Sequence, residues 1–230
     1  MKKLTLIVLF AALYSISYSQ SNNYWSSGGE MIFSFATIDN NGDDGGNIMR
    51  WSPVFNGQVM YNMDLSESFG LYTGFAIRNV GFIYNNYKVY EDGNEINVKK
   101  KFRTYNAAIP IGFKLGNLKK TFLYAGYDFE LPFNYKEKTF RDEKKDKFSV
   151  WFSDRVVQFQ HGFMVGIQFP YGANLKFKYY LTNFLNMDYT DSSGKKPYEG
   201  LEANVFYVSL NFNLFTPFGV YKKGGASEYY

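Results

Sequence analysis

Apolar and polar residues alternate with a period of two in eight separate segments of the chain. Successive side chains of a strand point to opposite faces, so this pattern predicts strands with one apolar and one polar face. No segment shows a convincing helical period of about 3.6 residues, and we predict no helix of useful length. The predicted strands span residues 30–38, 51–63, 69–83, 104–115, 121–133, 156–169, 173–185 and 203–215.

The connections between these segments alternate in length without exception. Outer-membrane barrels have long outer loops and short periplasmic turns, and a tilted strand needs about 9 to 11 residues to cross a bilayer. The sequence therefore predicts an all-β fold, an eight-stranded antiparallel up-and-down transmembrane β-barrel of the outer-membrane type, over residues 20–215. The long, polar connections are residues 39–50, 84–103, 134–155 and 186–202, and the short ones are residues 64–68, 116–120 and 170–172.

Aromatic residues are unusually frequent, at 21% of the 230 residues, although the mean hydropathy is −0.31. Both values fit strands with one face toward lipid and one toward a polar interior. The aromatics gather near the strand ends, as in the two interfacial girdles of membrane barrels. A soluble secreted barrel that binds an apolar ligand in its interior shares the alternation and stays as an alternative. The predicted girdles are Trp51, Phe55, Phe82, Tyr84, Tyr105, Phe133 and Phe159 outside, and Tyr61, Phe69, Phe113, Phe122, Phe169, Tyr171 and Phe215 inside.

The N-terminus has the order of a secretory signal. A basic start at Lys2 and Lys3 precedes an apolar stretch over residues 4–13, and small Ser17 and Ser19 suit cleavage before Gln20. The apolar stretch is shorter than the roughly 17 to 25 residues of a membrane-spanning helix. We therefore expect a signal peptide over residues 1–19 and location in the cell outer membrane.

The chain is poor in the side chains that usually carry chemistry. It has no cysteine and a single histidine, which excludes disulfides, Cys-ligated zinc, a thiol nucleophile and any multi-histidine metal site. Loss of Lys2 and Lys3 with the signal lowers the formal net charge from +4 to +2, which argues against a nucleic-acid partner. We predict no catalytic residue, no cofactor and no metal ligand, and we expect that the protein is not an enzyme.

Four segments carry a family resemblance: Arg50-Trp51-Ser52-Pro53-Val54-Phe55-Asn56, Ile77-Arg78-Asn79-Val80-Gly81-Phe82, Ala108-Ile109-Pro110-Ile111-Gly112-Phe113-Lys114-Leu115-Gly116 and Lys176-Phe177-Lys178-Tyr179-Tyr180-Leu181-Thr182-Asn183-Phe184. They resemble the outer-membrane β-barrel domain family of Bacteroidota, which includes the PorT-like proteins. The resemblance covers about the whole mature chain. It implies an eight-stranded outer-membrane barrel, and most members have no assigned activity.

The polar face of the predicted strands carries charged residues. An eight-stranded barrel is just wide enough for side chains to fill it, so these charges are predicted to pair inside as a closed polar plug. A narrow ion path or a proton-sensing carboxylate pair is the alternative. The predicted lumen network is Arg78, Lys114, Asp128, Glu130, Lys176 and Lys178.

Lys99, Lys100, Lys101 and Arg103 lie where the second long connection re-enters the membrane. Near the outer leaflet such cations can pair with lipopolysaccharide phosphates, whereas a solvated loop face is the plainer interpretation. The cation-rich stretch over residues 136–147 poses the same choice. Outer-membrane lipid and lipopolysaccharide are the expected partners.

Two further patterns in the sequence are weaker. His161, with Ser149, Ser153 and Asp154 near it in sequence, suggests a rim enzyme acting on lipid A or peptide, but no spacing specifies a triad. The segment over residues 39–50 resembles a calcium loop but has Asp44 and Arg50 where Gly and Glu are required, so an Asn-Gly turn is favoured. Residues 216–230 are predicted to be a short periplasmic tail. We expect a non-enzymatic, structural or surface-binding protein.

Overall fold

The computed structural model of the protein describes residues 22–44, 46, 48–91, 94–141 and 144–217. The predicted signal peptide and residues 218–230 of the predicted tail lie outside the described residues. The elements are β1 (Asn22–Asn40), β2 (Asp43–Asp44), β3 (Arg50–Ser52), β4 (Gly57–Asp64), β5 (Phe69–Glu91), β6 (Asn94–Gly116), β7 (Phe122–Arg141), β8 (Lys144–Trp151), β9 (Gln160–Gln168), η1 (Pro170–Gly172), β10 (Ala173–Tyr180) and β11 (Leu201–Phe212). Within these ranges, no helix is long and apolar enough to cross a membrane.

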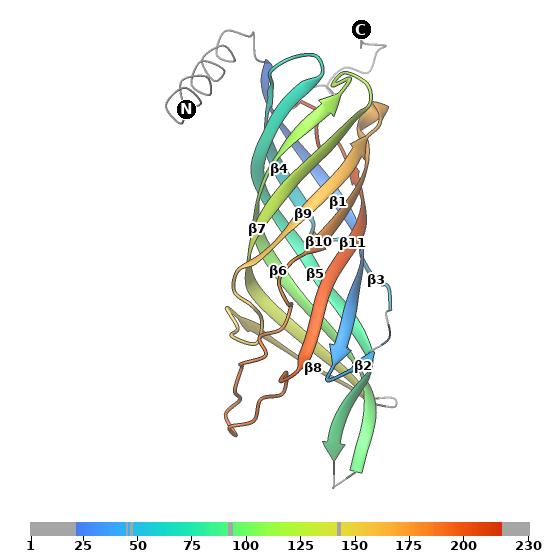
Figure 1. Ribbon diagram of the computed structural model, residues 1–230, viewed down its shortest axis with the longest axis vertical. Helices are drawn as coiled ribbons and strands as arrows, with labels where there is room; N and C mark the ends of the chain where they lie inside the picture. Colours follow the sequence, from blue (N-terminus) through green and yellow to red (C-terminus); the bar gives the residue numbers. More distant parts are fainter. Residues whose placement is uncertain (1–21, 45, 47, 92–93, 142–143, 218–230) are drawn as a thin grey trace, which may run out of the picture.

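Eight of these strands close into a ring (Figure 1). The order is β1, β4, β5, β6, β7, β9, β10 and β11, and every neighbouring pair is antiparallel. The ring closes where β11 pairs with β1, from Gly29 opposite Phe212 to Asn40 opposite Leu201. Closure leaves the ring without an open sheet edge. The prediction of an eight-stranded antiparallel barrel is confirmed.

Two hairpins continue the wall far beyond the other strands. β5 and β6 each have 23 residues, about twice the length that a membrane crossing takes, and they stay paired up to Glu91 and Asn94. β7 continues to Arg141 and pairs there with β8. Both hairpins lie at the lower end of the barrel in Figure 1. The connections predicted over residues 84–103 and 134–155 are therefore largely strand.

The second predicted strand, residues 51–63, is interrupted. It forms β3 and β4, which both pair with β1, and residues 53–56 separate them. Pro53 lacks an N–H for the ladder, and Phe55 has a left-handed φ of 61° that a regular strand does not accommodate. Apolar and polar residues alternate on both sides of residues 53–56, so the sequence pattern predicted one continuous strand.

The two faces of the wall exchange character near one end of the barrel. On β11, the outward side chains from Phe212 to Phe206 are apolar, whereas Asn204 and Glu202 follow them on the same face. The inward face changes in the opposite sense, from Ser209 and Asn211 to buried Val205, Ala203 and Leu201. On β6 the same exchange falls between Tyr105 and Arg103 outside, and between Thr104 and Phe102 inside. A band with apolar residues outside and polar residues inside thus ends in a cap with the reverse arrangement.

The cap has a core like that of a water-soluble domain. Phe82 and Phe102 stack at 4.9 Å between ring centroids, and Phe184 and Tyr198 from the connection before β11 pack against this pair. A second apolar cluster around Tyr72, Tyr124 and Phe215 fills the opposite end of the lumen. The girdle prediction was therefore wrong for four aromatics that share the inward face: Phe82, Tyr84, Phe122 and Phe215.

Candidate functional site

A charged cluster fills the lumen between the two apolar clusters. Arg78 of β5 lies with its Nη1 3.1 Å from Asp128 Oδ2 and 3.1 Å from Glu130 Oε1, both on β7. Its Nε lies 3.6 Å from Glu30 Oε2 on β1. From β10, Lys176 Nζ lies 2.8 Å from Glu30 Oε1. The remaining cation, Lys178, contacts both Asp128, at 2.5 Å, and Glu130.

The cluster is balanced in charge and hydrogen-bonded at its margin. Three cations face three carboxylates, and all six side chains are buried. Tyr180 Oη donates to Glu130 Oε2 at 2.9 Å, and Asn106 Nδ2 donates to the same oxygen at 2.6 Å. Buried charges need this degree of pairing, because an unpaired charge in a low-dielectric interior is strongly unfavourable. The arrangement joins β1, β5, β7 and β10 across the lumen.

The residues predicted for the lumen fall into two places. Arg78, Asp128, Glu130, Lys176 and Lys178 lie in the cluster, whereas Lys114 lies toward the other end of the lumen. There Lys114 contacts Asp64 and donates to Asn62 Oδ1 and Tyr24 Oη, each at 3.2 Å. Glu30 was not among the predicted lumen residues, because it opens the first predicted strand and its face was not assigned. Glu30 and Ser34 are separated by an even number of positions, so the alternation of the strand places both on the same, inward face.

The cations predicted as one lipopolysaccharide contact do not share a face. Lys100 turns inward, where its Nζ lies 2.6 Å from Glu137 Oε1 and 4.1 Å from the centre of the Tyr87 ring. Lys99, Lys101 and Arg103 point outward. Grouping Lys100 with them was wrong, because consecutive residues of a strand point to opposite faces.

His161 lies on the outward face of β9, opposite Phe129 of β7. Its Nδ1 is 2.5 Å from Tyr127 Oη, and the two rings stack. Ser149 donates instead to Asn134, and Ser153 accepts from the backbone of Arg155. No hydrogen bond between described residues joins His161 to Ser149, Ser153 or Asp154. The structure therefore does not join these four residues in one hydrogen-bonded group.

The segment that resembles a calcium loop is a hairpin turn. Asn40 pairs with Asp43, and Asn41 and Gly42 between them have φ of 55° and 92°. Positive φ at both positions is the signature of an Asn-Gly turn. In the described part of the chain, no group of three or more histidine or acidic residues is placed to hold a metal ion.

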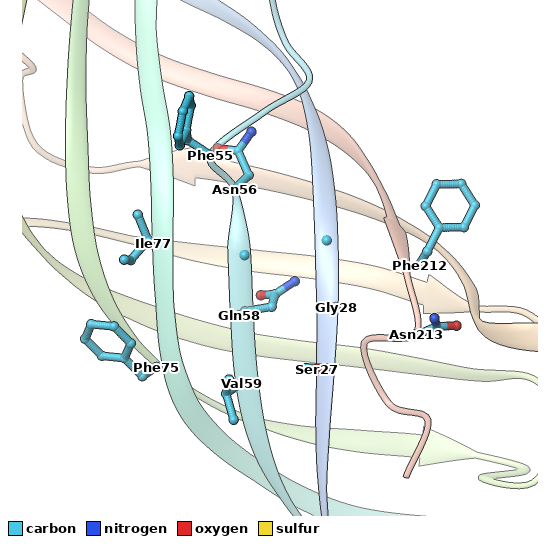
Figure 2. A pocket seen from close by; sticks show the side chains of 12 residues that line it. Ser27, Gly28, Phe55, Asn56, Gln58, Val59, Phe75, Ile77, Phe212 and Asn213 are labelled. Carbon is cyan, nitrogen blue, oxygen red and sulfur yellow. The ribbon is translucent and has the colours of Figure 1, made fainter. Parts of the chain in front are cut away.

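A hollow of about 800 Å³ lies over the β1–β4 pair on the outer wall (Figure 2). Gly29 and Gly57 face each other there, and a Cβ on either would meet no atom within 4 Å. Exposed Phe55, Phe75 and Phe212 border it. Of its polar side chains, Gln58 donates to Asn211 and Asn56 donates to Ser52 O. The residues that line the hollow carry no charge, and most of its lining surface is apolar.

Comparison with known proteins gives only distant likenesses. No family model and no curated protein matches the sequence. Neisserial surface protein A is 8% identical with a TM-score of 0.40, over 84% of this chain and 99% of that one. Ail of Yersinia pestis, in complex with the heparin analogue sucrose octasulfate, is 11% identical with a TM-score of 0.37, over 81% and 97%. The outer membrane protein OprG of Pseudomonas aeruginosa is 10% identical with a TM-score of 0.34, over 84% and 96%. At these values the likeness assigns no activity, ligand or partner to this chain.

Proposed function

We propose that the protein is a small, non-enzymatic outer-membrane β-barrel with a closed lumen, structural or surface-binding through its outer hairpins and loops. The carrying observation is the exchange of faces between the band and the cap. Large apolar side chains such as Phe163, Val165 and Leu210 are between 41% and 48% exposed around the band. A soluble protein rarely exposes so continuous an apolar surface, whereas a lipid-facing wall requires it.

The exchange of faces also supports an orientation in the membrane. Beyond the band, charged residues face outward and apolar residues face inward, which suits a wall surrounded by headgroups and water. The two long hairpins belong to this end, and the short turns, including η1, belong to the other. Outer-membrane barrels place their long loops outside the cell. The predicted signal peptide over residues 1–19 supplies the export step, and the PorT-like family of Bacteroidota is the proposed kinship.

A closed lumen is favoured over a conducting one. Side chains of β1, β5, β7 and β10 meet in the charged cluster, and aromatic clusters lie on both sides of it. An ion on this route passes one set of packed rings, displaces paired charges from one another and then passes the second set of rings. We expect the purified barrel to produce no stable conductance steps in a planar bilayer.

Membrane fractionation tests the proposal. The full chain, expressed in a bacterium with an outer membrane, should be recovered in the outer-membrane fraction. It should also migrate faster in detergent gels before heating than after, as a folded barrel does. Recovery as a soluble periplasmic protein, with migration that heating does not change, would support the soluble barrel instead.

A further inference from the structure

Cations gather on the outward face of the wall just beyond the apolar band. Lys101 of β6 lies opposite Lys138 of β7, which in turn lies opposite Lys147 of β8. Arg103 lies opposite Lys136 one step closer to the band. Because residues opposite each other share a face, these side chains form one surface. We call it the cationic face, made of Lys99, Lys101, Arg103, Lys136, Lys138, Lys145 and Lys147.

The protein does not neutralise this surface. The acidic residues of segments 99–105, 134–140 and 145–151 are Glu137 and Asp146, which occupy alternate positions and hence the opposite face. On that face, Glu137 forms an ion pair with Lys100 and accepts hydrogen bonds from the hydroxyls of Tyr135 and Tyr198. Within the described residues, no ion pair joins a member of the cationic face to a carboxylate. Like charges opposite each other destabilise a sheet, so this arrangement favours an external anion.

The height of the cationic face restricts the kind of anion. Arg103 and Lys136 both lie over the ring of one girdle residue, at 5.3 and 5.2 Å from the ring centre of Tyr105. Phe133 and Trp151 stack beside it at 5.9 Å. Girdle aromatics lie at headgroup level, so the cations point sideways into the headgroup layer rather than upward into solution.

We infer that the cationic face binds the phosphate groups of a neighbouring lipopolysaccharide molecule, an inference that rests on the outer-membrane location proposed above. The phosphates lie beside the wall at the level of Arg103, Lys101 and Lys138. The acyl chains of the same molecule then lie along the apolar band below, against Phe133 and Leu131. Ordered hairpins hold the cations in fixed register, so several phosphate oxygens can be contacted at once.

The electrostatics of Lys101 favour contact with an anion. Burial, together with the charges of Arg50, Lys138, Arg103 and Lys99, lowers the pKa of Lys101 to about 8. Burial and neighbouring cations also lower the pKa of Lys138. A bound phosphate opposes this mutual repulsion and returns both groups to the charged form.

Binding of defined lipids to the folded full chain tests the inference. Wild type and the variant K101Q/K138Q/K147Q are placed in nanodiscs, and their affinities for phosphorylated lipid A and for its dephosphorylated form are measured. Each cation near an anionic membrane surface contributes on the order of fivefold in affinity, so the triple variant should bind phosphorylated lipid A roughly a hundredfold more weakly. Wild type should discriminate between the two lipids, and the variant should lose that discrimination.

Two matched variants isolate the site. K88Q/K195Q/K196Q removes the same charge from exposed positions outside the cationic face and should bind like wild type. K101R/K138R/K147R keeps the charge and should retain most of the affinity. Equal binding by wild type and K101Q/K138Q/K147Q, or equal binding of both lipids by wild type, overturns the inference.

Failure of the lipid A inference can be distinguished from failure of the proposed outer-membrane function. Each variant is first shown to be in the outer-membrane fraction and to migrate faster before heating. A wild-type chain that fails this step contradicts the outer-membrane proposal itself. A folded outer-membrane barrel whose lipid A binding ignores the cationic face contradicts only the present inference. Preference for a water-soluble polyphosphate over phosphorylated lipid A would also overturn it.

Discussion

Lys178 Nζ lies 2.5 Å from Asp128 Oδ2 inside the barrel, and both side chains are fully buried. This contact ties β10 to β7 across the lumen, although β9 separates the two strands in the wall. It belongs to a group of three cations and three carboxylates, so each charge has a counter-charge. The net neutrality of the group, rather than any single pair, is what the interior requires.

Removing one cation from this group should be strongly destabilising. Lys178→Met leaves Asp128 and Glu130 with one positive partner fewer, and breaking a buried pair in this way costs about 3–5 kcal/mol. Urea unfolding of the barrel in lipid vesicles, followed by tryptophan fluorescence, measures the loss. The double variant Lys178→Met/Asp128→Asn restores neutrality and should be more stable than Lys178→Met alone. Equal stability of the two variants would show that charge balance is not what holds the cluster.

The outward face of the band can be tested with one substitution. Val165 lies midway along β9 with 48% of its surface exposed, opposite Ala125 and Phe177. In a lipid-facing wall, Val165→Arg should cost about 2–4 kcal/mol of unfolding free energy, as arginine does near the bilayer midplane. Ser192→Arg, at an exposed position in the outer connection before β11, should change it by less than about 0.5 kcal/mol. Similar small effects at both positions in vesicle unfolding would contradict a lipid-facing Val165.

Much of the wall follows from alternation alone. The period of two assigns Arg78, Asp128 and Lys176 to one face and Val165 to the other, and the rhythm of long and short connections predicts the ring of eight strands. Alternation does not predict which charged residues contact each other across the lumen. These contacts depend on the tilt and stagger of strands that are far apart in sequence. The contact of Glu30 with Arg78 and Lys176 is of this kind.

The exchange of polar and apolar faces near the cap could have been predicted by extending the alternation beyond the predicted strand ends. The inward face was predicted to be polar along its whole length, whereas it becomes apolar at Phe102 and Val205. The outward face had already turned charged at Arg103 and Glu202, so the exchange was visible in the sequence. Lys100 was misplaced for the opposite reason, because grouping neighbouring cations ignored the alternation that governs the rest of the chain.

Glycines accommodate large interior rings, and this can be measured at Gly166. A Cβ there would lie 2.4 Å from the Tyr124 ring, which is buried and donates to Asn174 Oδ1 at 2.6 Å. Gly166→Ala should therefore destabilise the barrel by about 1–3 kcal/mol through overpacking. Gly29→Ala adds the same methyl group where nothing lies within 4 Å, and it should be neutral or slightly stabilising. Comparable unfolding midpoints for both variants would argue against the packing of Tyr124 on Gly166.

The pH dependence of lipid A binding should report on Lys101. The pKa of this group is lowered to about 8 by burial and by Arg50, Lys138, Arg103 and Lys99, against an ordinary value of 10.5. The folded protein therefore releases this proton first as pH rises, and between these two values the unfolded chain holds more protons. Unliganded stability should rise across that window, whereas affinity for phosphorylated lipid A should fall because one positive charge is lost.

Lys101→Arg provides the control, because arginine stays charged over the whole range. Binding of phosphorylated lipid A in nanodiscs, measured from about pH 7 to about pH 9.5, should weaken more steeply for wild type than for Lys101→Arg. The remaining slope of the variant reports on the other lysines of the cationic face, among which Lys138 also has a lowered pKa. Superimposable pH profiles would mean that Lys101 does not lose its charge in this range, or that its charge does not contact the lipid.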